Sequence, residues 1–394
     1  MYGRSLRELR HAGKSAEMEL EVLRLYRVTF VWENFGPTHD DRLSACTGDP
    51  NLEVDAIQFA TQDAVYEWSS SELRSVPTQT IFRERPVRGS NFLLLLGLLK
   101  ALSRSPGKVV FFCHYERWPV FCAALLRRML CGKNILMFDS KFDDYQRSIW
   151  RELLKRVYLA PYHGAIVGSH RSEKYYAFLC GTKKPVGLGY DTISSQRVRD
   201  MGVKDPLRQF PIQSRPFICV ARLVEKKNHI TLLRAYAEWR ALTGGGRRLR
   251  LIGSGPLEKR LRLLAYELGI SDYVDFEGFL QIEDVCLAIQ SSLCLILPST
   301  EEQFGFVVTE ALALGIPVVV SSNAGACDVV VENGINGWVI DPNNPRTLVK
   351  AMCRIHESPD EWRRMSIEAS AGGSKGDVQH FVSSVVYLCK AVSG

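Results

Sequence analysis

Two glutamates with seven residues between them stand in segment 298–322, PSTEEQFGFVVTEALALGIPVVVSS. Glu302 precedes the glycine Gly305, and Glu310 follows it within an apolar stretch. Two solvent-exposed glutamates without a function could also stand at this spacing, because glutamate is common and such pairs arise by chance. The alternative is a pair of carboxylates that bind one ligand rich in hydroxyl groups. The elements around the pair favour this second interpretation.

A strand, a glycine-containing loop and a helix follow one another here. We expect a strand over 293–297 and a helix over Phe306–Leu314 that ends at Gly315, with Pro317 opening the next strand. The loop 299–305, STEEQFG, then joins the carboxyl end of a strand to the start of a helix. In open parallel sheets this edge binds ligands.

The start of this helix is suited to a diphosphate. The backbone N–H groups of Phe304, Gly305 and Phe306 and the helix dipole favour an anion there. Glu310 lies about 7 Å further along the helix axis, which suits a carboxylate that accepts two ribose hydroxyls. Glu302 would lie nearer to a sugar attached to the diphosphate.

A leaving diphosphate also needs cations, and the segment after 217–221 supplies them. RLVEKKN contains Arg222 and Lys227, with Lys226 as a competitor for the second position. Alone, these residues would be taken as surface cations. At the carboxyl end of the first strand of a domain, we expect them to bind phosphate.

Short apolar runs alternate with amphipathic stretches along nearly the whole chain, which predicts βαβ units and parallel sheets. In the first half we expect strands over 27–32, 109–113, 135–138 and 165–167, with helices over 119–130 and 146–157. In the second half we expect strands over 217–221, 249–252, 274–277, 293–297, 317–321 and 337–340, with helices over 229–241, 256–268 and 306–314.

The predicted architecture is two Rossmann-like, doubly wound domains that face each other across a ligand-binding cleft. Three prolines interrupt the pattern near 206–216 and indicate a linker. The predicted parts are a polar N-terminal extension (1–26), an N-terminal domain (27–205), this linker, a C-terminal domain (217–375) and a C-terminal helix (376–394) packed back on the N-terminal domain.

Composition indicates an ordinary globular protein, with 46% hydrophobic and 24% charged residues among 394. The longest strongly apolar run, Phe92–Leu99, is much shorter than the roughly 20 residues that span a bilayer. The N-terminus lacks the apolar core of a secretory signal. Eleven cysteines without a CxxC pair indicate reduced thiols. We therefore expect a cytoplasmic protein.

Positive charge is concentrated between Lys100 and Arg156, where twelve Lys or Arg residues stand against five Asp or Glu residues. This bias favours an anionic partner such as a phosphorylated lipid or the inner face of the plasma membrane. Nucleic acid is not expected, because no recognition motif accompanies the charge. A basic solvated surface is the alternative.

Residues 217–347 resemble the donor domain of retaining glycosyltransferase family 4, the group 1 glycosyltransferases, which have the GT-B fold. The resemblance is carried by FICVARLVEKKN, LRLIGSGP, VDFEGFL, the E-x7-E block of 298–322 and NGINGWVIDPNNP, in the family's order. The first half resembles the family more loosely, through VVFFCHYERWP and WENFGPTHDDRL. The resemblance implies that domain 27–205 binds the acceptor and that domain 217–375 binds the nucleotide sugar.

The resemblance implies roles for individual residues. Catalytic roles fall on His114, Glu302, Arg222 and Lys227, and donor binding falls on Gly36, Gly253, Gly255, Gly278, Phe304, Gly305, Phe306 and Glu310. His39 and Arg42 are acceptor-side candidates. The chain departs from the family pattern at Pro37, where a second glycine is usual, at Gly189–Asp191, which replaces Asn-Gly-Val-Asp, and at Asp328, where many members carry Glu.

The resemblance also implies a reaction, the transfer of a hexose-type sugar with retention from a nucleotide sugar, UDP- or GDP-linked, to a glycan or a lipid-diphosphate-linked acceptor. Retention can follow from a covalent intermediate or from front-face attack, and we favour the latter. No Asp-x-Asp motif occurs, so neither a metal nor another cofactor is expected. A soluble small acceptor and a non-catalytic nucleotide-sugar-binding protein remain the alternatives.

Overall fold

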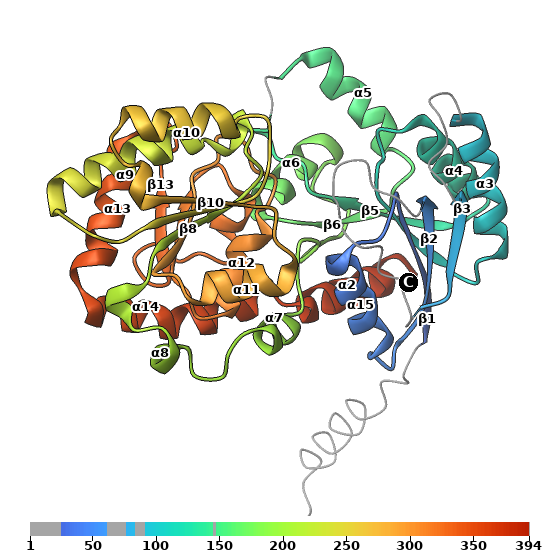
Figure 1. Ribbon diagram of the computed structural model, residues 1–394. Coiled ribbons are helices and arrows are strands. Elements are labelled where there is room, and N and C mark those ends of the chain that lie inside the picture. Colours follow the sequence, from blue (N-terminus) through green and yellow to red (C-terminus); the bar gives the residue numbers. More distant parts are fainter. Residues whose placement is uncertain (1–24, 61–75, 83–90, 145–146, 394) are drawn as a thin grey trace, which may run out of the picture.

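The computed structural model describes residues 25–60, 76–82, 91–144 and 147–393. It contains two α/β domains, each built on one parallel sheet with helices on both faces (Figure 1). This confirms the predicted pair of doubly wound, Rossmann-like domains.

The N-terminal sheet has seven strands in the order β3-β2-β1-β4-β5-β6-β7, and every neighbouring pair is parallel. The strands are β1 (Tyr26–Trp32), β2 (Leu52–Ala60), β3 (Thr78–Phe82), β4 (Val109–Phe112), β5 (Lys133–Phe138), β6 (Gly164–Val167) and β7 (Val186–Leu188). The helices of this domain are α2 (Pro37–Thr47), α3 (Asn91–Arg104), α4 (Trp118–Met129), α5 (Ile149–Leu159) and α6 (His170–Cys180).

Side chains of these strands alternate between two hydrophobic cores, one on each face of the sheet. On one face the strands pack against buried residues of α3, α4 and α6 and against Leu159 at the end of α5. On the other face they pack against α2 and the C-terminal helix α15 (Val378–Ser393). Successive side chains of a strand point to opposite faces of the sheet, and both faces are covered by helices. Nearly every side chain of these strands is therefore buried, which explains why the strands are apolar almost throughout.

The C-terminal sheet has six parallel strands in the order β10-β9-β8-β11-β12-β13. These are β8 (Phe217–Val220), β9 (Leu249–Ile252), β10 (Val274–Gly278), β11 (Cys294–Leu297), β12 (Val318–Ser321) and β13 (Gly337–Ile340). The surrounding helices are α9 (His229–Thr243), α10 (Glu258–Glu267), α11 (Ile282–Gln290), α12 (Phe306–Ala313), α13 (Pro345–Glu357) and α14 (Pro359–Gly372). One continuous apolar core joins them.

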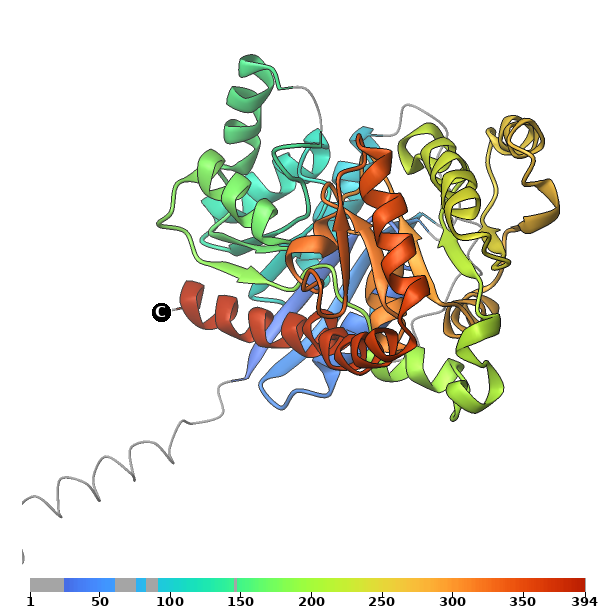
Figure 2. The ribbon, with the colours of Figure 1, turned by 90° about the vertical axis from the view of Figure 1, so that its left-hand side faces the viewer.

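The last helix returns to the N-terminal domain. Figure 2 shows α15, in red, leaving the C-terminal domain and running along the N-terminal one. Its Phe381 ring lies 5.6 Å from the ring of Phe30 in β1. The two domains are therefore joined by two chain crossings.

Segment 206–216, the predicted linker, contains the short helix α8 (Pro206–Gln209) and a 3-10 turn. Arg215 in this segment is buried and donates hydrogen bonds to the carbonyls of Gln290 and Ser292, 2.8 and 3.0 Å away. Its guanidinium also lies over the Trp362 ring. The segment is thus held against the C-terminal domain. Helix α7 (Ser195–Met201), just before it, also packs on α11 and α12 of that domain.

All ten predicted strands are present, with bounds that shift by at most two residues. The sequence interpretation missed β2, β3 and β7. In β2, Asp55 interrupts the apolar run. It is buried because Thr29 and Ser105 donate hydrogen bonds to its carboxylate over 2.7 and 2.8 Å.

Candidate active site

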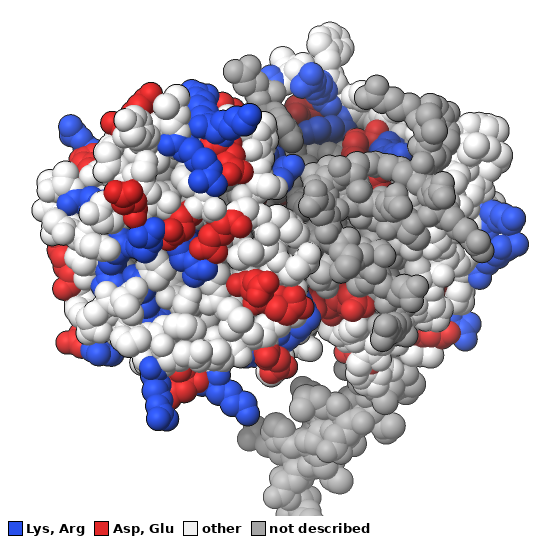
Figure 3. All heavy atoms as spheres, in the orientation of Figure 1, with Lys and Arg blue, Asp and Glu red and all other residues white. Residues whose placement is uncertain are grey.

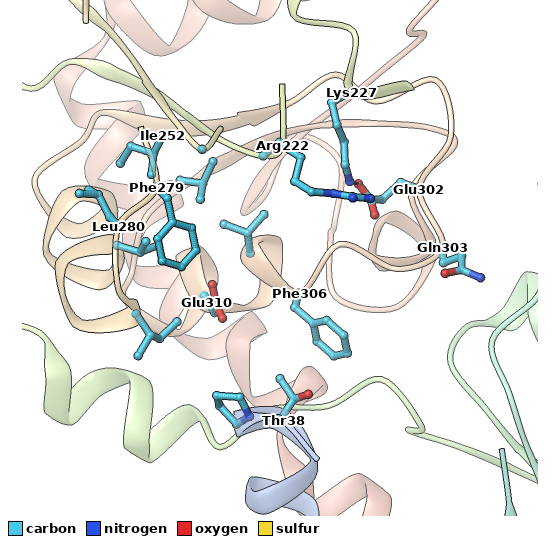
Figure 4. Close-up of a pocket in the computed structure, with 18 of the residues that line it drawn as sticks. Thr38, Arg222, Lys227, Ile252, Phe279, Leu280, Glu302, Gln303, Phe306 and Glu310 are labelled. Atoms are coloured by element: carbon cyan, nitrogen blue, oxygen red, sulfur yellow. Dashed lines mark hydrogen bonds and ion pairs between the residues drawn. The ribbon is translucent and has the colours of Figure 1, made fainter. Parts of the chain in front are cut away.

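A pocket of about 530 Å³ lies between the two domains, at the carboxyl ends of β8 and β9. The C-terminal domain forms most of its wall, and the start of α2 closes it from the N-terminal side (Figure 4). Eight of the predicted site residues line it: Gly36, His39, Arg222, Lys227, Gly253, Glu302, Phe306 and Glu310. The other six, His114, Arg42, Gly255, Gly278, Phe304 and Gly305, lie outside its lining.

Glu310 is the most unusual group of the pocket. It is 8% exposed, and within the described part of the chain no side-chain or backbone donor hydrogen-bonds to its carboxylate. The nearby guanidinium of Arg197 is instead bound to Asp41, with two N–O distances of 2.6 Å. Burial raises the pKa of Glu310 to about 7, although Arg197 acts in the opposite direction. A buried carboxylate without donors is costly unless a ligand supplies them.

The N-terminus of α12 lies next to Glu310. Gly305 precedes the helix with φ +97°, a conformation that glycine adopts readily. Its Cβ position would also lie 2.9 Å from Leu297 Cδ2, so the turn needs a glycine. Phe306 lines the pocket, whereas Phe304 is buried with its ring 5.6 Å from that of Phe306. The first-turn N–H groups of a helix have no acceptor within that helix, which leaves them for an anion.

The predicted cations and Glu302 meet at the other end of the pocket. Lys227 Nζ pairs with Glu302 Oε2, which also accepts a hydrogen bond from the Ser299 hydroxyl over 3.2 Å. Figure 4 shows the Arg222 side chain pointing toward this pair. The turn that carries Lys227 is held by Asn228, whose amide donates to Pro298 O over 3.1 Å. The pocket thus has a cationic end at Arg222 and Lys227.

Three glycines hold the strand ends close together. Gly253 has φ +130°, and a Cβ there would lie 2.2 Å from the carbonyl oxygen of Ala221. A Cβ at Gly255 would lie 2.4 Å from Leu223 O. Gly278, with φ +72°, accepts a 2.7 Å hydrogen bond from the Gly253 N–H. Of the three, Gly253 lines the pocket, and the other two support it from behind.

An apolar slot faces Glu310, and the sequence interpretation did not identify its side chains. Phe279, Leu280, Ile282 and Val285 form it, together with Ile252 of β9. In Figure 4, Glu310 lies between Phe279 and Phe306. An apolar slot beside a buried carboxylate fits an aromatic ring joined to a group with hydroxyls. The only sequence feature that could have indicated this slot is the loop after the predicted strand 274–277, which contains Phe279 and Leu280.

The N-terminal side of the pocket is the first turn of α2, which begins at Pro37 after Gly36. His39 Nδ1 accepts a 3.0 Å hydrogen bond from the Gly36 N–H, and its ring packs against Trp32. Burial, and next the charge of Arg42, hold the pKa of His39 well below its ordinary value. His39 is therefore neutral at physiological pH, with its proton on Nε2.

Arg42, an acceptor-side candidate, lies outside the lining of this pocket. It is 2% exposed and donates to the backbone carbonyls of Thr38 and Tyr190 over 2.9 and 2.6 Å. Its guanidinium also lies over the rings of Trp32, Tyr190 and Phe381. The Arg42 guanidinium thus holds together three parts of the N-terminal domain: α2, the segment after β7, and α15.

His114 follows β4 with φ +55° and stays outside the pocket lining. Its Nε2 lies 3.9 Å from a Glu33 carboxylate oxygen, and its Nδ1 lies 3.6 Å from one of Glu116. The neighbouring Cys113 sulfur, and then Glu116, raise the pKa of His114 well above its ordinary value, while burial opposes them. The structure thus surrounds His114 with acidic groups.

Lys141 is a residue that the sequence interpretation missed. It is 1% exposed and pairs with Asp144, which lines the pocket. Its Nζ also donates a 2.6 Å hydrogen bond to the backbone carbonyl of Glu302 in the other domain. The contact spans 161 residues of sequence, so no local pattern could have indicated it.

The described part of the chain holds neither a cluster of metal-ligating side chains nor a helix that could span a bilayer. Across residues 25–60, 76–82, 91–144 and 147–393, three or more His, Cys, Asp or Glu side chains never gather in a way that could hold a metal ion. Over the same ranges, no helix has both the length and the hydropathy needed to cross a bilayer.

Comparison with known proteins gives the C-terminal domain a family relationship. Residues 208–371 match the family described as "Glycosyl transferases group 1". An uncharacterized glycosyltransferase of Methanocaldococcus jannaschii is 31% identical over 157 residues, 40% of this chain and 38% of that protein. A putative colanic acid biosynthesis glycosyltransferase of Salmonella typhimurium is 33% identical over 144 residues, 35% of each chain. The match thus spans only a little over a third of the length of these relatives.

Solved structures match nearly the whole chain. Sucrose-phosphate synthase from Thermosynechococcus elongatus superimposes with a TM-score of 0.69 at 18% identity, covering 93% of this chain and 99% of that one. Anabaena HepE, solved in complex with UDP and glucose, gives a TM-score of 0.72 at 16% identity, covering 93% and 100%. At such identities the likeness shows the fold alone. The chain therefore has the GT-B glycosyltransferase fold, and its C-terminal half is related to the group 1 glycosyltransferases.

Proposed function

We propose that this protein is a retaining glycosyltransferase of family 4 that moves a hexose-type sugar from a nucleotide sugar to an acceptor. The observation that carries the proposal is Glu310, a buried carboxylate that faces an interdomain pocket without a donor from the described residues. It lies in the same pocket as a helix N-terminus, two cations and an apolar slot. These features together match the parts of a sugar nucleotide.

The donor is proposed to lie along the pocket with its base in the slot around Phe279. Glu310 accepts hydrogen bonds from two ribose hydroxyls, which satisfies its oxygens. The diphosphate lies between the first turn of α12 and the cationic end formed by Arg222 and Lys227. The turn at Gly253 lets the backbone approach the ligand closely. In this arrangement Glu302 is the first residue of the E-x7-E pair and lies nearest to the sugar.

The proposed reaction is front-face substitution at the anomeric carbon. The bond from that carbon to the diphosphate oxygen breaks, and the acceptor oxygen forms its bond on the same face. The acceptor proton passes to the leaving diphosphate. Arg222, Lys227 and the helix N-terminus stabilise the charge that develops on the leaving group, so no metal ion is required. Glu302 fixes Lys227 in place and accepts hydrogen bonds from the sugar.

The N-terminal domain is proposed to hold the acceptor, a glycan or a lipid-diphosphate-linked sugar. His39 lies at the mouth of the pocket as a neutral donor through Nε2. His114 lies outside the pocket lining, from where its charge would act on the sugar at longer range. Support for glycan or lipid chemistry comes from relatives named for colanic acid biosynthesis and for a GDP-mannose-dependent phosphatidylinositol mannoside mannosyltransferase.

A turnover assay tests this proposal. UDP- and GDP-sugars are incubated with the protein and candidate acceptors, and release of the nucleoside diphosphate is measured with the parent, Glu310→Gln and Glu283→Gln. Glu283 is a matched control, because it is exposed on α11 of the same domain and lies outside the pocket lining. Loss of turnover with Glu310→Gln alone, and an acceptor product that keeps the anomeric configuration by NMR, are expected.

The two alternatives give different results in the same assay. A non-catalytic binding protein would bind the donor without releasing a nucleoside diphosphate under any condition. An enzyme with a soluble acceptor would turn over fully in the absence of lipid-linked sugars. Turnover that stops on addition of EDTA would refute the metal-free part of the proposal.

A further inference from the structure

Helix α5 carries its apolar side chains on the outside of the protein. Ile149 and Trp150 are 78% and 81% exposed, and Leu153, Leu154 and Val157 are each about half exposed. With 100° of rotation per residue, these five side chains cover one arc of about 140°. We call them the α5 face. A surface helix normally turns such a stripe toward the core.

The opposite side of α5 is polar and packs on the protein. Glu152 accepts a 2.5 Å hydrogen bond from the Tyr175 hydroxyl of α6, and Lys155 Nζ donates to the same oxygen over 2.7 Å. Tyr158 contacts the Phe121 ring at 4.8 Å. Leu159, at the C-terminal end, is the one fully buried residue of the helix. These contacts hold α5 with its polar side toward the protein and its apolar face toward the outside.

Basic residues border the α5 face on both sides. Arg156 and Arg151 are exposed and fall about 20° and 60° outside the apolar arc, on opposite sides of it. Arg156 donates to the carbonyl of Phe178, and Phe178 and Phe142 add two further exposed rings beside the helix. An apolar arc with one exposed arginine on each side matches the pattern of a helix that lies in the interface of a membrane.

The position of α5 makes this face accessible to a flat surface. Figures 1 and 2 show α5 projecting from the N-terminal domain, away from both sheets. Figure 3 shows Lys and Arg side chains beside uncharged surface at the same end of the molecule. An anionic lipid surface matches both features, since it accepts the apolar arc and attracts the arginines.

We propose that the α5 face docks on an anionic membrane, with Trp150 and Leu154 in the headgroup and acyl boundary and Arg151 and Arg156 at the phosphates. The loop before α5 carries Asp144, which lines the pocket, and Lys141, which contacts the Glu302 carbonyl. Docking would thus hold the mouth of the pocket near the lipid. The docking itself does not depend on sugar transfer.

Vesicle sedimentation tests the proposal. The full-length protein is mixed with phosphatidylcholine vesicles with and without phosphatidylglycerol, and the parent is compared with the double variant Trp150→Ser and Leu154→Ser. The control is Leu263→Ser with Tyr266→Ser, two exposed apolar residues of α10 in the other domain. We expect the α5 variant to bind anionic vesicles about tenfold more weakly or worse, and the control to bind like the parent.

A second pair of substitutions tests the charge. Arg151→Gln with Arg156→Gln should weaken binding to anionic vesicles and reduce its dependence on salt. Because the changed residues are exposed, melting temperature and nucleotide binding should stay those of the parent. A parent that ignores anionic vesicles, or binds neutral ones equally, would overturn the proposal. An α5 variant that keeps vesicle binding would also overturn it. So would a variant whose only change is from a dimer to a monomer, since that result would assign the α5 face to contact with another copy of this chain.

Discussion

Replacing Glu310 by glutamine should stabilise the ligand-free protein while weakening nucleotide binding. The pKa of this carboxyl is raised from 4.5 to about 7 by burial, so the folded state resists ionisation that the unfolded chain accepts freely. Below pH 4.5 the carboxyl is protonated in both states and costs nothing. As pH rises from 4.5 to 7 it ionises in the unfolded chain first, and stability falls.

The size of this effect follows from proton linkage. One pKa unit corresponds to about 1.4 kcal/mol, so above pH 7 the carboxyl lowers the free energy of unfolding by about 3 kcal/mol. A glutamine is uncharged and nearly the same shape, so Glu310→Gln should recover much of this amount at pH 8 and little at pH 5. In a chain of this length, this corresponds to a rise in Tm of several degrees.

The assay is thermal and urea unfolding of the parent, Glu310→Gln and Glu283→Gln at pH 5 and pH 8, each with and without nucleotide. Exposed Glu283 should show no such difference. With nucleotide present the order should reverse, because the ribose hydroxyls donate to the carboxylate and each hydrogen bond to a charged group contributes about 1.5–3 kcal/mol. The reasoning is refuted if Glu310→Gln is less stable than the parent at pH 8, or if the difference is independent of pH.

Three further predictions follow from the same contacts. Gly253→Ala should weaken nucleotide binding and destabilise the protein by roughly 2–4 kcal/mol in urea unfolding, because its Cβ would lie 2.2 Å from a carbonyl oxygen; Gly246→Ala, where the space is open, should change neither, and equal effects would contradict the steric argument. Arg42→Met should lower the melting temperature, since it removes the 2.6 Å hydrogen bond from the guanidinium to the Tyr190 carbonyl, and a hydrogen bond from a charged group contributes about 1.5–3 kcal/mol; a changed acceptor preference at unchanged stability would instead support the original acceptor-side assignment. Lys141→Met should reduce kcat more than it alters the Kd of the nucleotide, because Lys141 holds the backbone of Glu302 rather than the ligand; a selective loss of nucleotide affinity would show that this assignment is wrong.

The C-terminal domain could be predicted closely because its signals are local. Its strands are buried apolar runs, and glycines with positive φ mark the turns, as at Gly305 and Gly315. Four predicted residues could be placed in one pocket, because each lies at the carboxyl end of a parallel strand or just beyond it. These are Arg222, Lys227, Glu302 and Glu310. This edge is fixed by topology, so side chains far apart in sequence could be placed there.

The N-terminal side was harder, because its contacts join distant parts of the chain. Arg42 sits in an α2 segment that gives no hint of Tyr190 or Phe381, which enclose it from the segment after β7 and from α15. The strand β2 was not predicted because Asp55 interrupts its apolar run. The burial of Asp55 depends on two hydroxyl donors from other parts of the chain, Thr29 and Ser105. The apolar arc of α5 was visible as a helix, but its outward orientation depends on polar contacts with α6.

The most direct test of the central claim is a calorimetric titration of UDP and of GDP into the parent, Glu310→Gln and Glu283→Gln. If Glu310 receives the ribose hydroxyls, one nucleotide binds the parent and Glu283→Gln with the same Kd, and the Kd for Glu310→Gln rises by about tenfold or more. Equal affinities for all three proteins, or no binding of either nucleotide, would contradict the assignment of this pocket as the donor site.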